Sequence, residues 1–425
     1  MLDLNMKLHY KLLLFLVPTA LDAQLDSIPQ SFIMPSTELG YSIHMGSTGM
    51  NNDMLYKLGL GGHISSEAID RNEEGMGKVS KVGSISNLDL THYFKAPLFG
   101  QREKFRWRSV GVNYATAQSA IFAKDAWRLL FKGNSDYLGQ TLEINKLNYT
   151  RWNSTSLNAS FSLSEKTSRI GERLTLDYLS FGLDLVHQFN NARFGNSDLY
   201  TDSNANFINT RLQGAYVLGN SNRALDGIGT HIGAGFKIGR LKLSIDKLGF
   251  AYMGNLNSYK VNTEQTFGGN FKSVDDIPVK TISQADIQRS QLNSGAWVNK
   301  QRDTIINTFV PTKENASAIR LLPFIIQAEF ASEDKGDILS AYYQNINGMF
   351  PYVSYQKRLL NTPFGHIYAS ASVGGFDTYD LGLQLKIKPK RYTHIDIDFR
   401  GLEALIAPQS THGTLIGLKL KQYWE

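Results

Sequence analysis

The sequence of 425 residues contains no cysteine. This absence excludes a disulfide framework and any metal site with thiolate ligands, and it suits an oxidising compartment. Long hydrophobic runs are also lacking, because no apolar stretch after residue 23 approaches the roughly 20 residues that a membrane-spanning helix needs. Although the net charge is +6, Lys and Arg are spread along the chain without a basic block. We therefore expect no nucleic-acid partner.

Recognisable catalytic motifs are missing as well. The chain has no G-x-S-x-G, no phosphate-binding G-x-x-x-x-G-K-[ST] and no H-E-x-x-H. The sequence Gly-Asn-Ser-Asp occurs at Gly133–Asp136 and at Gly195–Asp198. A serine beside an aspartate would suit an outer-membrane lipid hydrolase, but this composition is also that of ordinary turns. We predict a protein that is not an enzyme and that uses no cofactor or metal.

The N-terminal segment predicts export. From Met6, two lysines precede the short apolar run Leu12–Val17, and Ala23 follows at a plausible cleavage point. A basic start, a short apolar stretch and a small residue at the cut are typical of a secretory signal peptide. We expect residues 1–23 to be the signal peptide and residues 24–425 to form one exported domain. A buried N-terminal helix is the alternative.

Strict alternation marks the C-terminal region. In Leu381–Lys388, in His394–Phe399 and in Ile416–Trp424 as far as Lys421, every second residue is aliphatic or aromatic and the intervening ones are mostly polar or charged. Alternation with a period of two predicts β-strands with one apolar and one polar face. A soluble sandwich and a membrane barrel both fit this pattern. Export, the absence of membrane-helix candidates, 11% aromatic residues and 37 Gly favour the barrel.

Less regular alternation extends along most of the chain. We predict an all-β, transmembrane, antiparallel barrel of about 14 strands, with a range of about 12–16. A phase change near Tyr178 predicts a β-bulge, Ala123–Phe131 predicts one short helix, and the polar segment 254–317 predicts a long loop or plug. Further strand candidates are Leu55–Ile64, Ile85–Phe94, Phe105–Tyr114, Leu142–Thr150, Ser156–Leu163, Leu174–Phe189, Phe207–Leu218, His231–Ile238, Leu241–Ile245, Ala318–Phe330, Ala341–Gln356 and His366–Val373.

The charged faces of the predicted strands supply the candidate site. Neighbouring antiparallel strands place such residues opposite one another, so we expect cross-strand ion pairs where the registers match. These pairs would form either a ladder that stabilises a narrow lumen or a charged constriction that selects solutes. The candidate lumen-facing residues are Lys386, Lys388, His394, Asp396, Asp398, Lys419, Lys421, Arg106 and Arg108.

One stretch carries a resemblance to a known family. A short helix that ends in Gly-Asn is followed by Tyr-x-Gly-x-x-Leu and by LDYLSFGLDL, all within Trp127–Leu185, and RLLPFIIQAEF follows at Arg320–Phe330. These segments resemble the outer-membrane barrel family called domain of unknown function 5723. The resemblance implies a barrel of unassigned role, similar in shape to long-chain fatty-acid transporters, and it implies no catalytic residues. Such barrels usually end on an aromatic residue, whereas here Glu425 follows Trp424.

Together these observations predict a channel or transporter in the Gram-negative outer membrane, for small or hydrophobic solutes, with a charged and partly plugged lumen. The alternative functions are an accessory barrel that anchors surface or secretion proteins and, more remotely, a hydrolase. Expected partners are outer-membrane lipid, the barrel-insertion machinery acting on the C-terminal aromatic strand, and a small hydrophobic ligand. We expect a monomer, because a closed barrel leaves no strand edge to pair.

Overall fold

A computed structural model describes residues 35–60, 62–94, 105–163, 169–170, 174–204, 207–219, 223–268, 312–332, 336–376, 379–390, 392–409 and 411–424. The predicted signal peptide lies outside these residues. The strands are β1 (Ser36–Ser47), β2 (Val79–Tyr93), β3 (Phe105–Ala123), β4 (Thr141–Glu143), β5 (Asn148–Leu163), β6 (Arg169–Ile170), β7 (Leu174–Thr201), β8 (Phe207–Leu218), β9 (Gly227–Ile238), β10 (Leu241–Gly268), β11 (Thr312–Leu321), β12 (Ile325–Ala331), β13 (Ile338–Gln344), β14 (Phe350–Thr362), β15 (Gly365–Gly375), β16 (Tyr379–Lys390), β17 (Thr393–Arg400) and β18 (Gly413–Tyr423).

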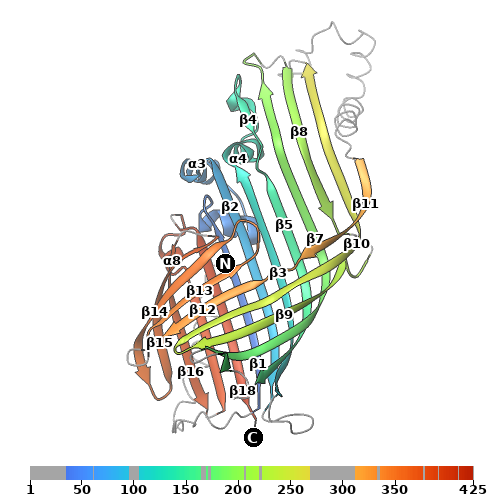
Figure 1. Cartoon of the computed structure of the whole chain (residues 1–425). Helices are drawn as coiled ribbons and strands as arrows, with labels where there is room; N and C mark the ends of the chain where they lie inside the picture. The colour runs from blue at the N-terminus through green and yellow to red at the C-terminus, as the bar shows by residue number, and fades with distance from the viewer. Residues whose placement is uncertain are drawn as a thin grey trace.

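The strands form one antiparallel sheet that closes on itself (Figure 1), because β18 pairs with β1 from Ser36–Tyr423 to Gly46–Gly413. A circuit of the ring passes β1, β2, β3, β5, β7, β9, β10, β12, β13, β14, β15, β16, β17 and β18, which gives 14 strands. The predicted barrel and its strand number are therefore confirmed. The predicted bulge is present too, as a register shift between Leu176 and Tyr178.

Two strands, each 28 residues long, extend beyond the ring at the end away from the C-terminus (Figure 1). There β7 and β10 pair with β8, and β10 also pairs with β11. The predicted loop 254–317 was wrong at both edges, since β10 continues to Gly268 and β11 begins at Thr312; residues 269–311 lie outside the described residues. The strand candidate Phe207–Leu218 coincides with β8. Polar strands lack the apolar face on which alternation is read, which is why the extension of β10 and the start of β11 were missed.

The helices also correct the prediction. Besides α4 (Lys124–Phe131), which matches the predicted helix, the structure contains α2 (Asn52–Leu60), α3 (Ser66–Gly75) and the single turn α8 (Glu403–Ile406). The predicted strand Leu55–Ile64 is therefore wrong, because its apolar residues recur at helical spacing. Ala341–Gln356 was predicted as one strand but comprises most of β13 and half of β14, which are joined by a turn.

The outer wall of the barrel is apolar. Along β1 the side chains of Leu39 and Tyr41 are 46% and 44% exposed, while the alternate residue His44 is buried. The same outward exposure of large hydrophobic residues recurs on Leu88, Leu90, Val110, Val112, Leu183, Phe250, Phe330, Leu339, Leu381 and Leu418. A continuous apolar exterior with a polar interior is the pattern of a barrel that crosses a bilayer. Among the described residues, no helix is both long and apolar enough to cross a membrane.

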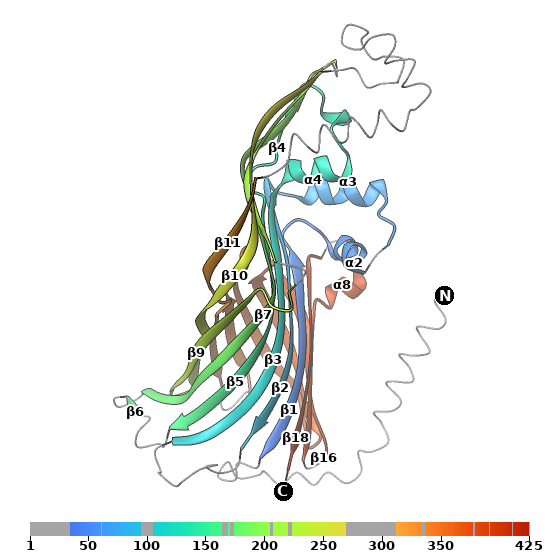
Figure 2. The same ribbon diagram turned by 90° about the vertical axis from the view of Figure 1, so that its right-hand side faces the viewer.

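The helices gather beyond one end of the ring, above β1 and β2 (Figure 2). We call α2, α3 and α4 the helical cap. Its core packs against Val82 and Ala120, which point outward by the alternation of β2 and β3. The core residues are Met50, Met54, Leu55, Met76, Phe122 and Trp127. The cap therefore sits on the outer wall of the barrel rather than inside it.

Candidate functional site

The lumen at the cap end is filled with apolar side chains. Phe376 and Met253 are fully buried there, together with Ile346 and Met349 from the β13–β14 turn. We call this cluster the lumenal plug; it comprises Ile85, Ala117, Trp152, Val186, Phe189, Ala251, Met253, Leu256, Leu322, Ile346, Met349 and Phe376. The ring of Phe376 lies against Gly83, where an added Cβ would stand 2.2 Å from a ring carbon. Glycine at position 83 therefore leaves the space that the Phe376 ring occupies.

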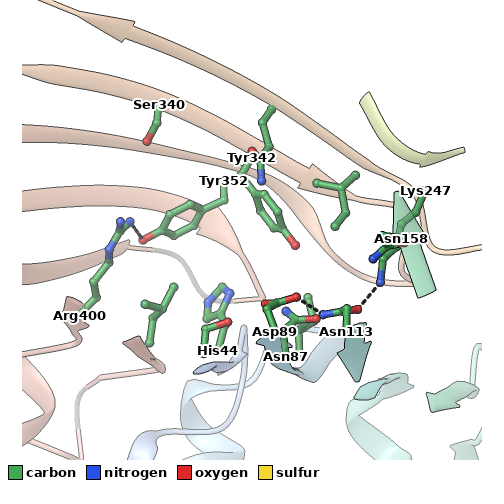
Figure 3. Close-up of a pocket in the computed structure, with 15 residues that line it drawn as sticks. His44, Asn87, Asp89, Asn113, Asn158, Lys247, Ser340, Tyr342, Tyr352 and Arg400 are labelled. Atoms are coloured by element: carbon green, nitrogen blue, oxygen red, sulfur yellow. Dashed lines mark hydrogen bonds between the residues drawn. The ribbon is translucent and has the colours of Figure 1, made fainter. Parts of the chain in front are cut away.

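A polar cavity of about 420 Å³ lies below the plug. On β2 the plug residue Ile85 is followed by Asn87 and Asp89, and both line the cavity on the side toward the C-terminus. The facing wall contributes Ser340 and Tyr342 from β13 (Figure 3). Hydrogen-bonding side chains therefore surround this space from both sides of the barrel.

A relay of three side chains, with the buried Asn113 at its centre, forms one wall. The ammonium group of Lys247 donates to the Asn113 side-chain oxygen, and the Asn113 amide donates to Asp89 (Figure 3). Lys247 has a left-handed backbone (φ 59°) and sits where β10 shifts register against β9. Since a bulge re-aims a side chain, this irregularity accounts for a lysine that points into the cavity from the wall.

The opposite wall carries a second network. Arg400 donates to the Tyr352 hydroxyl at 2.5 Å and to Asp398 at 2.9 Å. The Tyr352 hydroxyl in turn donates to Asp380 at 3.1 Å, and Ser372 also donates to Asp380. A buried arginine is tolerated only when its charge is matched and its donors are satisfied, and both conditions hold here.

A third buried group lies beside the cavity, in the wall formed by β5, β7 and β9. Asp184 accepts from Ser156 at 2.5 Å, and its other oxygen lies 2.5 Å from His231 Nδ1. These are the residue types of a hydrolytic triad, but the carboxylate stands between the serine and the histidine. A triad needs the histidine to contact the serine hydroxyl. The arrangement is therefore a buried hydrogen-bonded cluster with the carboxylate at its centre.

The predicted charged residues lie nearer the C-terminal end of the ring than the cavity does. The strand registers place Asp396 between Lys386 and Lys419, and His394 opposite Lys421, so these five residues share one face of the sheet. That face is also the one that carries Arg400, by the alternation of β17. Asp398 belongs to the Arg400 network. Lys388 lies two residues beyond Lys386 on β16. Arg106 belongs to β3, but its side chain is not among those that the structure describes.

The observed ion pairs use partners that the sequence did not suggest. Lys419 binds Glu38 of β1 at 2.9 Å, and Lys421 lies 3.8 Å from the other oxygen of Glu38. Arg108 binds Asp177 at 3.1 Å. Ring closure brings β1 next to β18 and so creates the first two contacts, which no local pattern could reveal.

The two Gly-Asn-Ser-Asp segments behave as turn and bulge sequences. Ser135 donates to the neighbouring Asp136 at 3.3 Å in an exposed turn. Ser197 is buried and donates to the backbone oxygen of Gly195 at 2.6 Å, beside a register shift in the β7–β8 pair. Within the described part of the chain, no group of three or more His, Asp or Glu could hold a metal ion.

Comparisons with known proteins were made on both sequence and fold. The sequence matches no protein-family model and no curated protein. The structure is similar to the toluene transporter TodX of P. putida (8% identity, 96% of this chain and 94% of that chain covered, TM-score 0.40). It is also similar to a FadL homologue of Pseudomonas aeruginosa (10%, 92% and 91%, 0.36) and to the translocator domain of the autotransporter NalP from Neisseria meningitidis (8%, 99% and 98%, 0.29). Similarity at these levels carries no argument about function, and membership of domain of unknown function 5723 stays a prediction.

Proposed function

We propose that this chain is an outer-membrane barrel that passes small solutes with both polar and apolar parts through its lumen. The observation that carries the proposal is the cavity of about 420 Å³ inside the ring, which lies within the usual range of roughly 300–1,000 Å³ for ligand sites. A barrel that served only as an anchor has no need of a cavity lined by converging hydrogen-bonding groups.

The chemistry of the lining selects the kind of solute. Lys247 and Arg400 bring positive charge to opposite walls, and Asp89 brings negative charge between them. Ile85, Ile325 and Leu415 supply apolar surface in the same cavity. A molecule with a hydrogen-bonding head and a small hydrocarbon body fits this mixture better than a bare ion or a pure hydrocarbon does.

The charged residues toward the C-terminal end of the ring are suited to a second selective step. Glu38 pairs there with Lys419 and Lys421 across the β1–β18 closure, and Arg108 of β3 pairs with Asp177 of β7. We propose that this paired belt orients solutes by charge as they leave the cavity. Rings of charged side chains tune permeation in this way.

A second function is favoured by the plug. Because Phe376 and Met253 are fully buried in a packed cluster, the lumen is obstructed at the cap end. An obstructed lumen suits an accessory barrel that anchors surface or secretion proteins. In that case the cavity would be incidental to function.

Uptake into vesicles separates the two functions. The purified chain would be reconstituted into liposomes, and the entry of a neutral sugar, an amino acid and an aromatic alcohol would be followed. Transport predicts faster entry of at least one solute than in protein-free liposomes, with a preference for solutes of mixed polarity. Equal entry of all solutes with and without protein would contradict transport and leave the accessory barrel.

A further inference from the structure

An apolar pocket of about 540 Å³ opens between the helical cap and the outer barrel wall. It lies between α2 and α4 and is lined almost entirely by hydrocarbon side chains, among them Met50, Leu58, Ala126, Trp127 and Leu130. It is separate from the lumenal cavity, because Phe122, which also lines it, points outward by the alternation of β3.

A second hollow of about 320 Å³ continues this pocket along the barrel wall. The two share Met50 and Leu58 in their linings. Its floor includes Met45 and Val82, which belong to the outer faces of β1 and β2. The apolar space therefore reaches from beneath α4 to the outside of the strands.

The outer face of β1 joins this space to the membrane-facing wall. Leu39, Tyr41, Ile43 and Met45 alternate outward without a polar interruption, and Met45 lines the second hollow. A chain lying on the wall at Leu39 can therefore extend to the cap over apolar surface throughout. Such a space offers water no hydrogen-bond partners, whereas burial there removes a hydrocarbon chain from water and stabilises it.

Exposed apolar residues beside the cap also indicate contact with lipid. In α8, which is followed by a segment that α2 hydrogen-bonds at Pro408 and Thr411, the side chains of Leu405 and Ile406 are 72% and 88% exposed. Leu130 of α4 is 75% exposed at the rim of the pocket. Helical segments with outward Leu and Ile at a barrel rim are suited to the boundary between headgroups and acyl chains.

We propose that the pocket between α2 and α4 is a lipid site that holds an acyl chain of a membrane lipid from the leaflet at the cap end. The chain leaves the bilayer along the outer face of β1 and ends beside Trp127. The proposal rests on the transmembrane fold and not on solute transport, so either can fail without the other.

Fluorescence quenching tests this site. The full chain would be reconstituted into phosphatidylcholine vesicles with or without bromine near the ends of the acyl chains. The contribution of Trp127 is the difference between the parent protein and Trp127→Phe. Brominated chains should reduce that difference signal at least twofold. A Trp152→Phe comparison supplies the matched control, because Trp152 is buried in the lumenal plug and its signal should not change.

A filled-pocket variant excludes simple proximity to the membrane. Ala126→Phe occupies the pocket, so quenching of Trp127 should be lost in it, while the folded variant keeps the mobility shift of a detergent-resistant barrel on unboiled gels. Unquenched Trp127 in the parent protein would overturn the proposal. Quenching that persists in Ala126→Phe would also overturn it, because the bromine would then reach Trp127 from outside the pocket.

Discussion

Phe376 is the largest fully buried side chain among the described residues, and it lies in the lumenal plug. It is fully buried, its ring centroid lies 6.1 Å from that of His44, and His44 lines the cavity directly below. Replacing a buried Phe by Ala typically costs about 3–5 kcal/mol, because packing is lost and a void remains. In Phe376→Ala that void borders the lumenal cavity. We therefore expect the variant to lose stability and to conduct at the same time.

Two assays and one control define this prediction. The stability of Phe376→Ala in denaturant should fall by about 3–5 kcal/mol, and single-protein conductance in a planar bilayer should rise several-fold. Phe330→Ala is the matched control, because Phe330 is 44% exposed on the outer wall and its loss leaves the plug intact. Gly83→Ala should also disturb the plug, since the new methyl group overlaps the ring. If Phe376→Ala and Phe330→Ala behave alike in both assays, the plug does not close the lumen.

Two further predictions concern buried charge. Asp184→Ala removes the acceptor of both Ser156 and His231, so we expect a loss of about 3–5 kcal/mol, measured by unfolding of the unboiled band, whereas Asp184→Asn should lose less. A loss below about 1 kcal/mol would show that water replaces the carboxylate. In the cap, burial raises the pKa of Glu73. The hydrogen bonds and positive charges of Lys132 and Arg128 outweigh burial and hold this pKa below its ordinary value of 4.5. The ionised Glu73 stabilises the folded cap fully at a pH above its pKa in the unfolded chain, and this stabilisation is lost as the pH falls through its lower pKa in the folded chain. Proteolysis of the cap should therefore accelerate only below about pH 4.5. Glu73→Gln should abolish that pH dependence.

The regular part of the fold could be predicted from the sequence because membrane strands repeat every two residues. Leu381–Lys388 and His394–Phe399 lie within β16 and β17, as their alternation indicates. The cap could not be predicted in the same way. Its α2 presents apolar residues to the outer wall at helical spacing, over a stretch too short to be distinguished from a strand.

Only part of the candidate site could be predicted from the sequence. Arg400 continues the phase of Asp396 and Asp398 by one more step, so the alternation of β17 could have revealed it. Lys247 could not be found this way, because a bulge reverses the phase of β10 just before it. The contact of Ser156 with Asp184 depends on strand register, which is a property of the closed sheet.

The most direct test of solute passage uses a single cysteine placed in a chain that has none. Ser340 lines the lumenal cavity, and the adjacent Leu339 is 48% exposed on the outer wall. Solute uptake would be measured for Ser340→Cys and Leu339→Cys before and after reaction with a bulky thiol reagent. If solutes cross through the cavity, modification should abolish uptake in Ser340→Cys and leave Leu339→Cys unchanged. Unaltered uptake in a fully modified Ser340→Cys protein would contradict passage through this cavity.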